Sequence, residues 1–132
     1  MFLMTLLGIF INAYANNYKK KDELLLLGKV IYIDPGHGGR DSGAIYGNIL
    51  EKNLNLEISL ELEQALGKQG AIVYLTRDGD YDLASSTINR KRNDLYNRVK
   101  LINNSNCDMY ISIHLNASPS SRWNGIQVFY SN

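Results

Sequence analysis

Both histidines of this 132-residue chain follow short apolar runs, at positions where a side chain could do chemistry. His37 lies in a glycine-rich loop shortly after the run at residues 30–33, and His114 follows residues 109–113. Imidazole nitrogens are common metal ligands, and glycines leave a loop without Cβ atoms that would obstruct a ligand. For either histidine alone a packing role is equally consistent with the sequence, but the pair favours a metal site.

A catalytic zinc ion needs a third protein ligand beside two imidazoles, commonly a carboxylate, and keeps a fourth position for water. Glu51 is the strongest candidate, because it begins a predicted helix only a turn-rich loop after His37. A carboxylate at a helix start also interacts favourably with the helix dipole, so this position has a second explanation. Asp34, Asp41 and Asp78 are weaker rivals. Of these, Asp34 is expected to turn the chain or to orient a ligand histidine.

Apolar runs predict the strands that carry these residues. Residues 30–33, 71–76 and 109–113 are rich in β-branched and aromatic side chains, which is typical of strands buried on both faces. Asp34-Pro35 ends the first run, because proline lacks the N–H that a sheet ladder needs. Residues 126–130 predict a fourth strand, whereas residues 41–48 predict an irregular, turn-rich loop.

Two helices are predicted between the strands. The apolar residues at 50–67 fit both strand alternation and helical spacing, but the length and the Leu, Glu, Ala and Gln content favour a helix that stops near Gly67. Ser86 or Thr87 could cap a second helix, which residues 103–106 end. The apolar stripe of that second helix is expected at Leu95, Val99 and Ile102.

The order strand, helix, strand, helix, strand, strand predicts an α/β domain with a mostly parallel or mixed central sheet flanked by helices. Because the carboxyl ends of parallel strands share one edge, and ligands bind in the crevice outside it, one group of polar residues is expected to meet there. They are His37, Arg77, His114 and Asn116. Arg77 could hold a substrate carboxylate, pair with Asp78 or be solvated, and Asn116 could donate to a substrate carbonyl or cap a turn.

Composition limits the classes of protein. The 14 Lys and Arg residues against 13 Asp and Glu give a net charge of +1, which argues against binding nucleic acid through a basic surface. Cys107 is the only cysteine, which excludes an intramolecular disulfide and a zinc cage built from cysteines. The length predicts one domain with a sizeable core, and we expect a monomer.

The N-terminus indicates export. Residues 2–11 are almost entirely apolar, and Ala13-Tyr14-Ala15 has the small-x-small spacing of a signal-peptidase site. Residues 1–15 are therefore interpreted as a signal-like segment or the remnant of a membrane anchor, 16–27 as a lysine-rich linker, and 28–132 as the folded domain. This organisation predicts an extracytoplasmic protein, with membrane association through the apolar segment.

From about Gly28 to the last residue, the chain resembles the zinc-dependent N-acetylmuramoyl-L-alanine amidases of the amidase-3 type. The segments that carry the resemblance are residues 33–39 (Ile-Asp-Pro-Gly-His-Gly-Gly), Glu51-Lys52, Thr76-Arg77, Arg98 with Asn103, and residues 112–117 (Ser-Ile-His-Leu-Asn-Ala). Residues 51–54, Ser118-Pro119 and Trp123-Asn124-Gly125 most resemble the members that act in spore germination.

The resemblance implies that His37, Glu51 and His114 bind Zn²⁺ within a mixed sheet flanked by helices. It also implies peptidoglycan as substrate, with hydrolysis of the amide between N-acetylmuramic acid and L-alanine in the cell wall or spore cortex. Two other functions share this ligand set or this substrate: a zinc peptidase or carboxypeptidase acting on wall peptides, and a non-catalytic peptidoglycan-binding protein.

The sequence departs from the family pattern after Tyr130. The family's catalytic glutamate belongs to a C-terminal strand that nothing in residues 131–132 matches, so we interpret the chain as a C-terminally truncated catalytic domain. The expectation is a chain that retains the three zinc ligands, contains no certain catalytic residue and has little or no amidase activity. Arg77 and Asn116 are the candidates for supporting roles.

Overall fold

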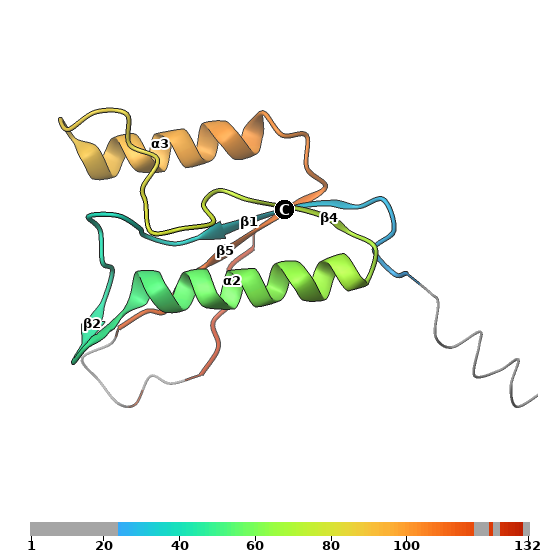
Figure 1. Cartoon of the computed structure of the whole chain (residues 1–132), viewed down its shortest axis with the longest axis horizontal. Coiled ribbons are helices and arrows are strands. Elements are labelled where there is room, and N and C mark those ends of the chain that lie inside the picture. Colours follow the sequence, from blue (N-terminus) through green and yellow to red (C-terminus); the bar gives the residue numbers. More distant parts are fainter. Residues whose placement is uncertain (1–23, 118–121, 123–124, 131–132) are drawn as a thin grey trace, which may run out of the picture.

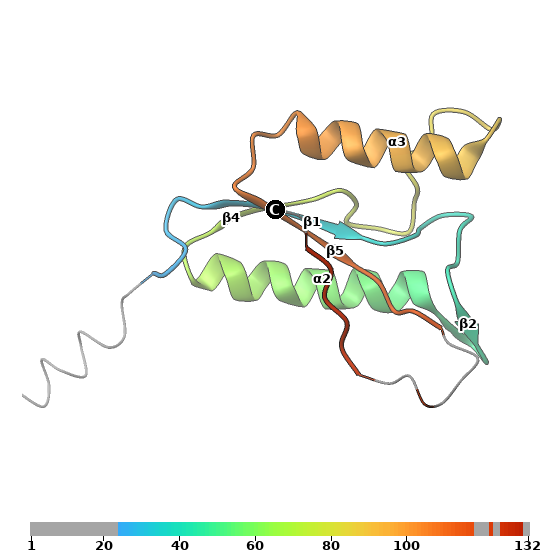
Figure 2. The ribbon, with the colours of Figure 1, turned by 180° about the vertical axis from the view of Figure 1, so that it is seen from behind.

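The polypeptide forms a parallel sheet that lies between two helices (Figure 1). The computed structural model describes residues 24–117, 122 and 125–130. Its elements follow in the order β1 (Val30–Pro35), β2 (Ile45–Tyr46), β3 (Ile49–Leu50), α2 (Glu51–Lys68), β4 (Ile72–Leu75), α3 (Arg90–Asn103) and β5 (Met109–Ile113). Helix α2 lies on one face of the sheet and α3 on the other (Figure 2), which confirms the predicted α/β class.

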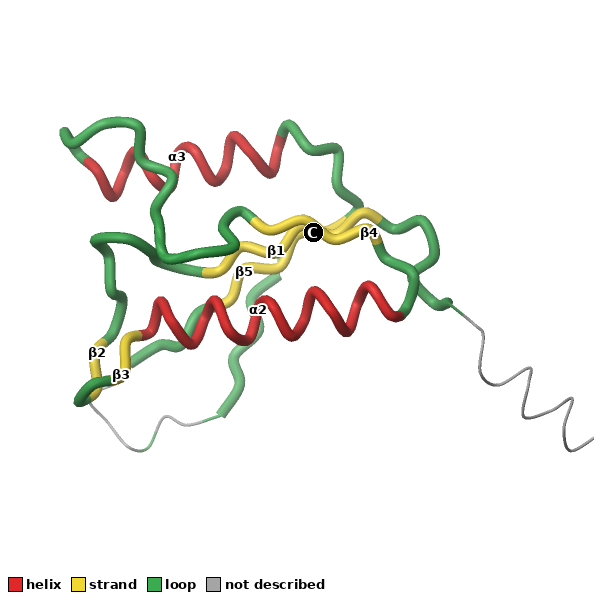
Figure 3. The backbone as a smooth tube through the Cα atoms, viewed as in Figure 1, coloured by secondary structure: helices red, strands yellow, loops and turns green. Residues whose placement is uncertain are grey.

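Strand β1 is the centre of the sheet (Figure 3). The strand order is β4-β1-β5, and both neighbours run parallel to β1. The buried hydrophobic side chains of the described residues are Ile31, Tyr32 and Ile33. A strand that is hydrogen-bonded on both edges and covered on both faces explains the uninterrupted apolar run. The parallel arrangement brings the carboxyl ends of all three strands to one edge, as predicted.

The outer strands are less buried than predicted. In β4 and β5 many side chains remain accessible, such as Tyr74 at 52% and Tyr110 at 60% exposure. Within the described residues each of these strands pairs only with β1. The apolar runs therefore indicated the strands correctly, but the expectation of burial on both faces was wrong.

The fourth predicted strand, at residues 126–130, is not formed. These residues have no regular secondary structure, and Ile126 and Phe129 are 95% and 85% exposed. A high β-propensity does not make a strand by itself, because a strand needs a neighbouring strand for its main-chain hydrogen bonds.

Helix α2 confirms the helical interpretation of a segment whose pattern also fitted a strand. Its buried residues recur at helical spacing: Glu51, Asn55 and Ser59. No side chain caps the helix; instead, the main-chain N–H groups of Glu51 and Lys52 donate to the carbonyl oxygens of Ala44 and Ser42. Because loop carbonyls satisfy the start of the helix, the Glu51 carboxylate is available for other contacts.

The loop that precedes α2 is more regular than the irregular segment predicted for residues 41–48. Strands β2 and β3 pair antiparallel in a short hairpin, with Ile45 opposite Leu50. Gly47 occupies the turn with a φ of +58°, a conformation that glycine adopts without steric cost. The hairpin ends directly at the first residue of α2, and so fixes where Glu51 begins the helix.

Helix α3 is anchored by polar groups. Its buried residues are Asp94 and Arg98, whereas Leu95 and Val99 of the predicted apolar stripe are 55% and 56% exposed. The prediction of a helix here is confirmed. The expectation that its apolar residues mark the buried face was wrong for the described structure, because the face toward the sheet carries the two charged groups.

The predicted cap of α3 was also wrong. The helix begins at Arg90 after Asn89, which has a φ of +50° and makes no capping hydrogen bond with its side chain. The Ser86 hydroxyl accepts instead from the main-chain N–H of Ile88, two residues along the chain, in a local turn. Serine turns and helix caps use the same hydroxyl chemistry, so the sequence did not separate them.

The predicted signal-like segment at residues 1–15 lies outside the described residues. The last residues of the predicted linker form a turn joined to the end of α2, with Leu26 N–H donating to Gln69 and Gly28 N–H donating to Gly70. Among the residues from 24 onward that the structure describes, no helix is long and apolar enough to cross a membrane.

Candidate metal centre

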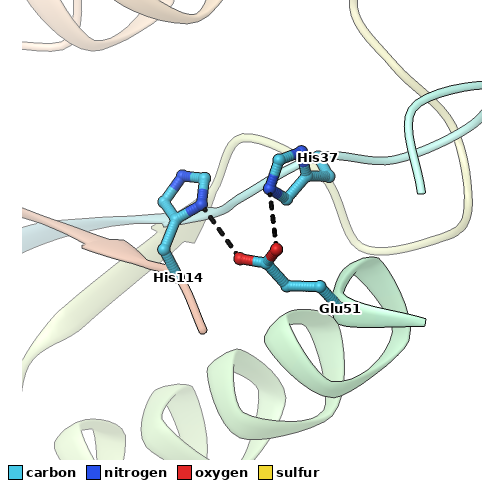
Figure 4. A group of neighbouring side chains, drawn as sticks. All are labelled: His37, Glu51 and His114. Atoms are coloured by element: carbon cyan, nitrogen blue, oxygen red, sulfur yellow. Dashed lines mark hydrogen bonds and ion pairs between the residues drawn. The ribbon is translucent and has the colours of Figure 1, made fainter. Parts of the chain in front are cut away.

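The three side chains predicted to bind a metal lie together at the carboxyl edge of the sheet (Figure 4). Nε2 of His37 is 3.2 Å from Oε2 of Glu51, and Nδ1 of His114 is 3.3 Å from Oε1 of the same carboxylate. One donor atom from each residue lies within 4.8 Å of the other two. Two ligands of one tetrahedral zinc ion lie roughly 3.3 Å apart, since each zinc–ligand distance is about 2.0–2.1 Å. These positions are therefore compatible with a shared ion.

The Glu51 carboxylate is buried and accepts hydrogen bonds from main-chain N–H groups. Ala44 donates to Oε2 at 2.8 Å, and Leu115 donates to Oε1 at 2.8 Å. Burial alone would favour the neutral acid, but these donors and the nearby His37 outweigh it and hold the pKa of Glu51 below its usual value. The group is anionic at neutral pH, which is the form that binds a metal.

Asp41 orients the imidazole of His37. Its Oδ2 lies 3.0 Å from Nδ1 of His37, so that Nε2 is the nitrogen directed toward Glu51. Carboxylates commonly fix metal-binding histidines in this way. Burial opposes ionisation of Asp41, but hydrogen bonds from His37, the Gly43 N–H and Lys91 lower its pKa to about 2. The carboxylate is consequently ionised at neutral pH.

Two glycines leave room for the ligand side chains. A Cβ atom added at Gly43 would lie 2.7 Å from Oε2 of Glu51 and 2.8 Å from Nε2 of His37. A Cβ atom added at Gly36 would overlap the imidazole of His114, whose Nδ1 would be 2.7 Å away. The space and the donor set, two nitrogens and one carboxylate, both fit a catalytic zinc ion.

A buried arginine supports the strained backbone of His37. His37 has a φ of +63°, a left-handed conformation that is unfavourable for a residue with a Cβ atom. Nη2 of Arg98 donates to the His37 carbonyl at 2.6 Å, and Nη1 donates to the Pro35 carbonyl at 2.8 Å. The guanidinium also forms ion pairs with Asp34 at 2.7 Å and Asp94 at 2.9 Å. Through this buried side chain α3 holds the backbone of the loop that carries His37.

Asp34 was expected to turn the chain or to orient a ligand histidine, and the second alternative is wrong because its carboxylate contacts other groups. Besides its ion pair with Arg98, its carboxylate accepts from the Thr76 hydroxyl at 2.6 Å and the Ser112 hydroxyl at 3.0 Å. Asp34 belongs to the central strand, so its side chain reaches the residues that end β4 and β5 rather than the histidine loop. The carboxylate therefore ties the three strands together next to the metal centre.

Arg77 was expected to be solvated, to pair with Asp78 or to contact substrate, but it is only 1% exposed. Its guanidinium donates to main-chain carbonyl groups: those of Pro35, Gly36, Lys52 and Gly79. The rival ligand Asp78 accepts instead from the Tyr81 hydroxyl at 2.7 Å. The sequence did not indicate this burial, because an arginine after a strand more often points to water.

The remaining candidate for a supporting role, Asn116, is accessible to solvent just beyond His114. Trp123 lies outside the described residues. Asn55 was not among the predicted site residues, yet it is fully buried and donates from Nδ2 to the Gly36 carbonyl at 3.2 Å. Its position one helical turn after Glu51 is the signal that could have identified it.

A parallel α/β sheet that gathers two imidazoles and a carboxylate at its carboxyl edge is typical of metal-dependent hydrolases. The chain belongs to the N-acetylmuramoyl-L-alanine amidase family (Amidase_3), whose model matches residues 31–132. It is 49% identical over 130 residues to the germination-specific N-acetylmuramoyl-L-alanine amidase of Bacillus subtilis, a match that covers 95% of this chain and 55% of that protein. It is also 37% identical over 105 residues to the amidase LytC of Bacillus subtilis, covering 80% of this chain and 19% of LytC.

Solved structures share the fold. The CwlD amidase from Clostridioides difficile, determined in complex with the GerS lipoprotein, matches with a TM-score of 0.68 and 39% identity over 73% of this chain and 52% of that chain. The catalytic domain of CwlV from Bacillus (Paenibacillus) polymyxa matches with a TM-score of 0.62 and 38% identity over 74% of this chain and 50% of that chain. The chain thus spans about half the length of the germination-specific relative and of these solved structures.

Proposed function

We propose that His37, Glu51 and His114 together bind one zinc ion. The observation that carries the proposal is the convergence of the three side chains from separate elements, with His37 and His114 lying 3.2 and 3.3 Å from the two oxygens of one carboxylate. The depressed pKa of Glu51 and the space beside Gly36 and Gly43 support the same ion.

The proposed reaction is hydrolysis of the amide that joins the lactyl group of N-acetylmuramic acid to L-alanine in peptidoglycan. Zinc, when bound, would polarise the amide carbonyl and acidify a water molecule. Glu51 remains anionic, while Asp41 holds Nδ1 of His37 and leaves Nε2 free to coordinate. The chain's own residues thereby fix the charge and the orientation of two of the three ligands.

Neither carboxylate at the centre is free to act as a general base. Both oxygens of Glu51 accept main-chain hydrogen bonds, and Asp41 is bonded to His37. Within the described residues, the potential metal-binding group contains no carboxylate besides Glu51. A general base contributes about 10²–10⁴-fold to such a reaction, and neither of these two carboxylates is placed to supply that factor.

Metal analysis and product analysis test the two parts of the proposal. Purified chain should contain one zinc ion, and long incubation with peptidoglycan should release peptides that begin with a free L-alanine amine, identified by mass spectrometry. Cleavage within the peptide, with the muramic acid amide intact, would favour a wall peptidase instead. Absence of bound zinc would overturn the proposed zinc site, and cleavage at a bond other than the muramic acid amide would overturn the proposed reaction.

Asp41→Asn is expected to weaken zinc binding by about 10-fold to 100-fold, the usual effect of removing a partner that orients a ligand. The amide oxygen can accept from His37 or from Gly43, but it lacks the negative charge that lies 3.0 Å from Nδ1. Competition with a chromophoric chelator measures the change. Lys91→Met is the control, because it removes the other ion-pair partner of Asp41 and should leave zinc affinity unchanged.

We further propose that the protein acts outside the cytoplasm, where peptidoglycan lies, and that residues 1–15 direct its export or anchor it. The proposal is supported by the apolar residues 2–11 and the Ala13-Tyr14-Ala15 spacing.

A further inference from the structure

We propose that Arg77 is a positioning residue that sets the relative placement of His37 and Glu51 around the metal ion. The inference rests on the zinc site proposed above. It concerns a side chain whose hydrogen bonds go to main-chain carbonyl groups, and which acts on the ligands through the backbone beside them.

One nitrogen of Arg77 donates hydrogen bonds to main-chain carbonyl groups next to two of the ligands. Nη2 donates to the Gly36 carbonyl at 2.9 Å and to the Lys52 carbonyl at 2.8 Å. Gly36 directly precedes His37, and Lys52 directly follows Glu51. This buried N–H₂ group therefore ties the end of β1 to the first turn of α2, beside the Asn55 amide that donates to the same Gly36 carbonyl.

The position of the third ligand, His114, depends on the same Gly36 peptide group. The imidazole of His114 lies against Gly36, so closely that a Cβ atom there would overlap the ring. Movement of Gly36 would consequently change the space available to His114 as well as the position of His37. By holding the Gly36 carbonyl, Arg77 influences all three donors.

The planar fork of arginine is needed for this arrangement. Nε donates to the Pro35 carbonyl at 2.9 Å, and Nη1 donates to the Gly79 carbonyl at 3.0 Å. The three nitrogens together reach the histidine loop, the start of α2 and the loop after β4. A lysine has one nitrogen on a flexible stem and cannot reproduce this rigid geometry.

The burial of Arg77 is costly for a residue that serves stability alone. No carboxylate of the described residues lies within ion-pair distance of its guanidinium, and burial together with the neighbouring Arg98 lowers the pKa of Arg77. A buried charge is often replaceable by an apolar side chain without loss of stability. The position of this charge between two metal ligands gives it a role that an apolar side chain could not fill.

Arg77→Lys tests the inference through metal affinity and coordination geometry. We expect zinc affinity to fall by about 10-fold to 100-fold, and the visible absorption spectrum of the cobalt-substituted chain to change in intensity. Ile31→Val, in the buried part of β1, is the matched control: it should lower the melting temperature while leaving zinc affinity and the cobalt spectrum as in the wild type. Should Arg77→Lys not fold, Arg77→Gln takes its place, because it removes the buried charge and keeps an N–H₂ donor.

The outcomes separate this inference from the proposed function. A variant at position 77 that binds zinc and cobalt as the wild type does, with only a lower melting temperature, overturns the positioning role and leaves the zinc site intact. Failure of both variants to fold assigns Arg77 to folding and also overturns the role. A wild-type chain without zinc overturns the proposed function and, with it, this inference.

Discussion

Replacing His114 with alanine is expected to abolish stoichiometric zinc binding. The substitution removes one of the two nitrogen donors and leaves Glu51 and His37, and two ligands do not make a stable zinc site. The imidazole lies on the open side of the centre, with 43% of the side chain exposed, so its loss should leave the fold intact. Zinc content of the dialysed protein, measured by mass spectrometry, should fall from one ion per chain to none.

Leu115→Ala is the matched control for this prediction. Leu115 is the next residue along the chain, and it contributes to the centre through its main-chain N–H, which alanine retains. The control variant should keep one zinc ion. If His114→Ala retained zinc with the affinity of the wild type, the assignment of the three ligands would be wrong.

The second large effect is expected for Arg98→Met, which should lower the free energy of unfolding by about 3–5 kcal/mol. The substitution leaves the carboxylates of Asp34 and Asp94 without the cation that lies 2.7 and 2.9 Å from them. It also removes the hydrogen bond that Arg98 donates to the His37 carbonyl, which supports the left-handed conformation of His37. Such a loss is a large part of the roughly 5–15 kcal/mol that stabilises a typical domain.

Urea unfolding followed by circular dichroism measures this change. Arg92→Met, at an exposed position on the same helix, is the control and should alter the free energy of unfolding by about 0.5 kcal/mol or less. Equal stability of the two variants would show that the ion pairs of Arg98 contribute nothing net to the fold.

The sequence predicted the parts of the fold that depend on local pattern. The apolar run before Asp34 identified the central strand, and the composition of residues 50–67 identified α2 despite its ambiguous periodicity. Burial was less predictable, because it depends on what covers each element. For this reason the strands at 72–75 and 109–113 were found but expected to be more buried than they are, and a strand was expected at 126–130 where none forms.

The site was predictable to the same extent: its ligands follow from local sequence pattern, whereas the contacts that hold them join residues far apart in the chain. Two histidines that each follow a strand, and a glutamate that begins a helix, were enough to select the residues that converge. Arg77 and Arg98 were singled out, but their contacts were not predictable, because the carbonyl groups they hold are distant in the chain: Arg98 is 61 residues from His37, and Arg77 is 41 residues from Gly36. Every residue has a main-chain carbonyl group, so the sequence does not indicate which carbonyl a charged side chain will contact.

The wide spacing of the three donors along the chain couples metal binding to folding. His114 and Glu51 are 63 residues apart, and they meet only when β5 has paired with β1. In an unfolded chain the entropy of closing such a loop opposes their meeting, so zinc at the proposed site would bind the native state far more tightly than the unfolded one. Zinc bound at the proposed site would therefore stabilise the fold: free zinc at ten times its dissociation constant would add about 1.4 kcal/mol to the free energy of unfolding, and scarcity of zinc would leave the newly made chain more exposed to proteases.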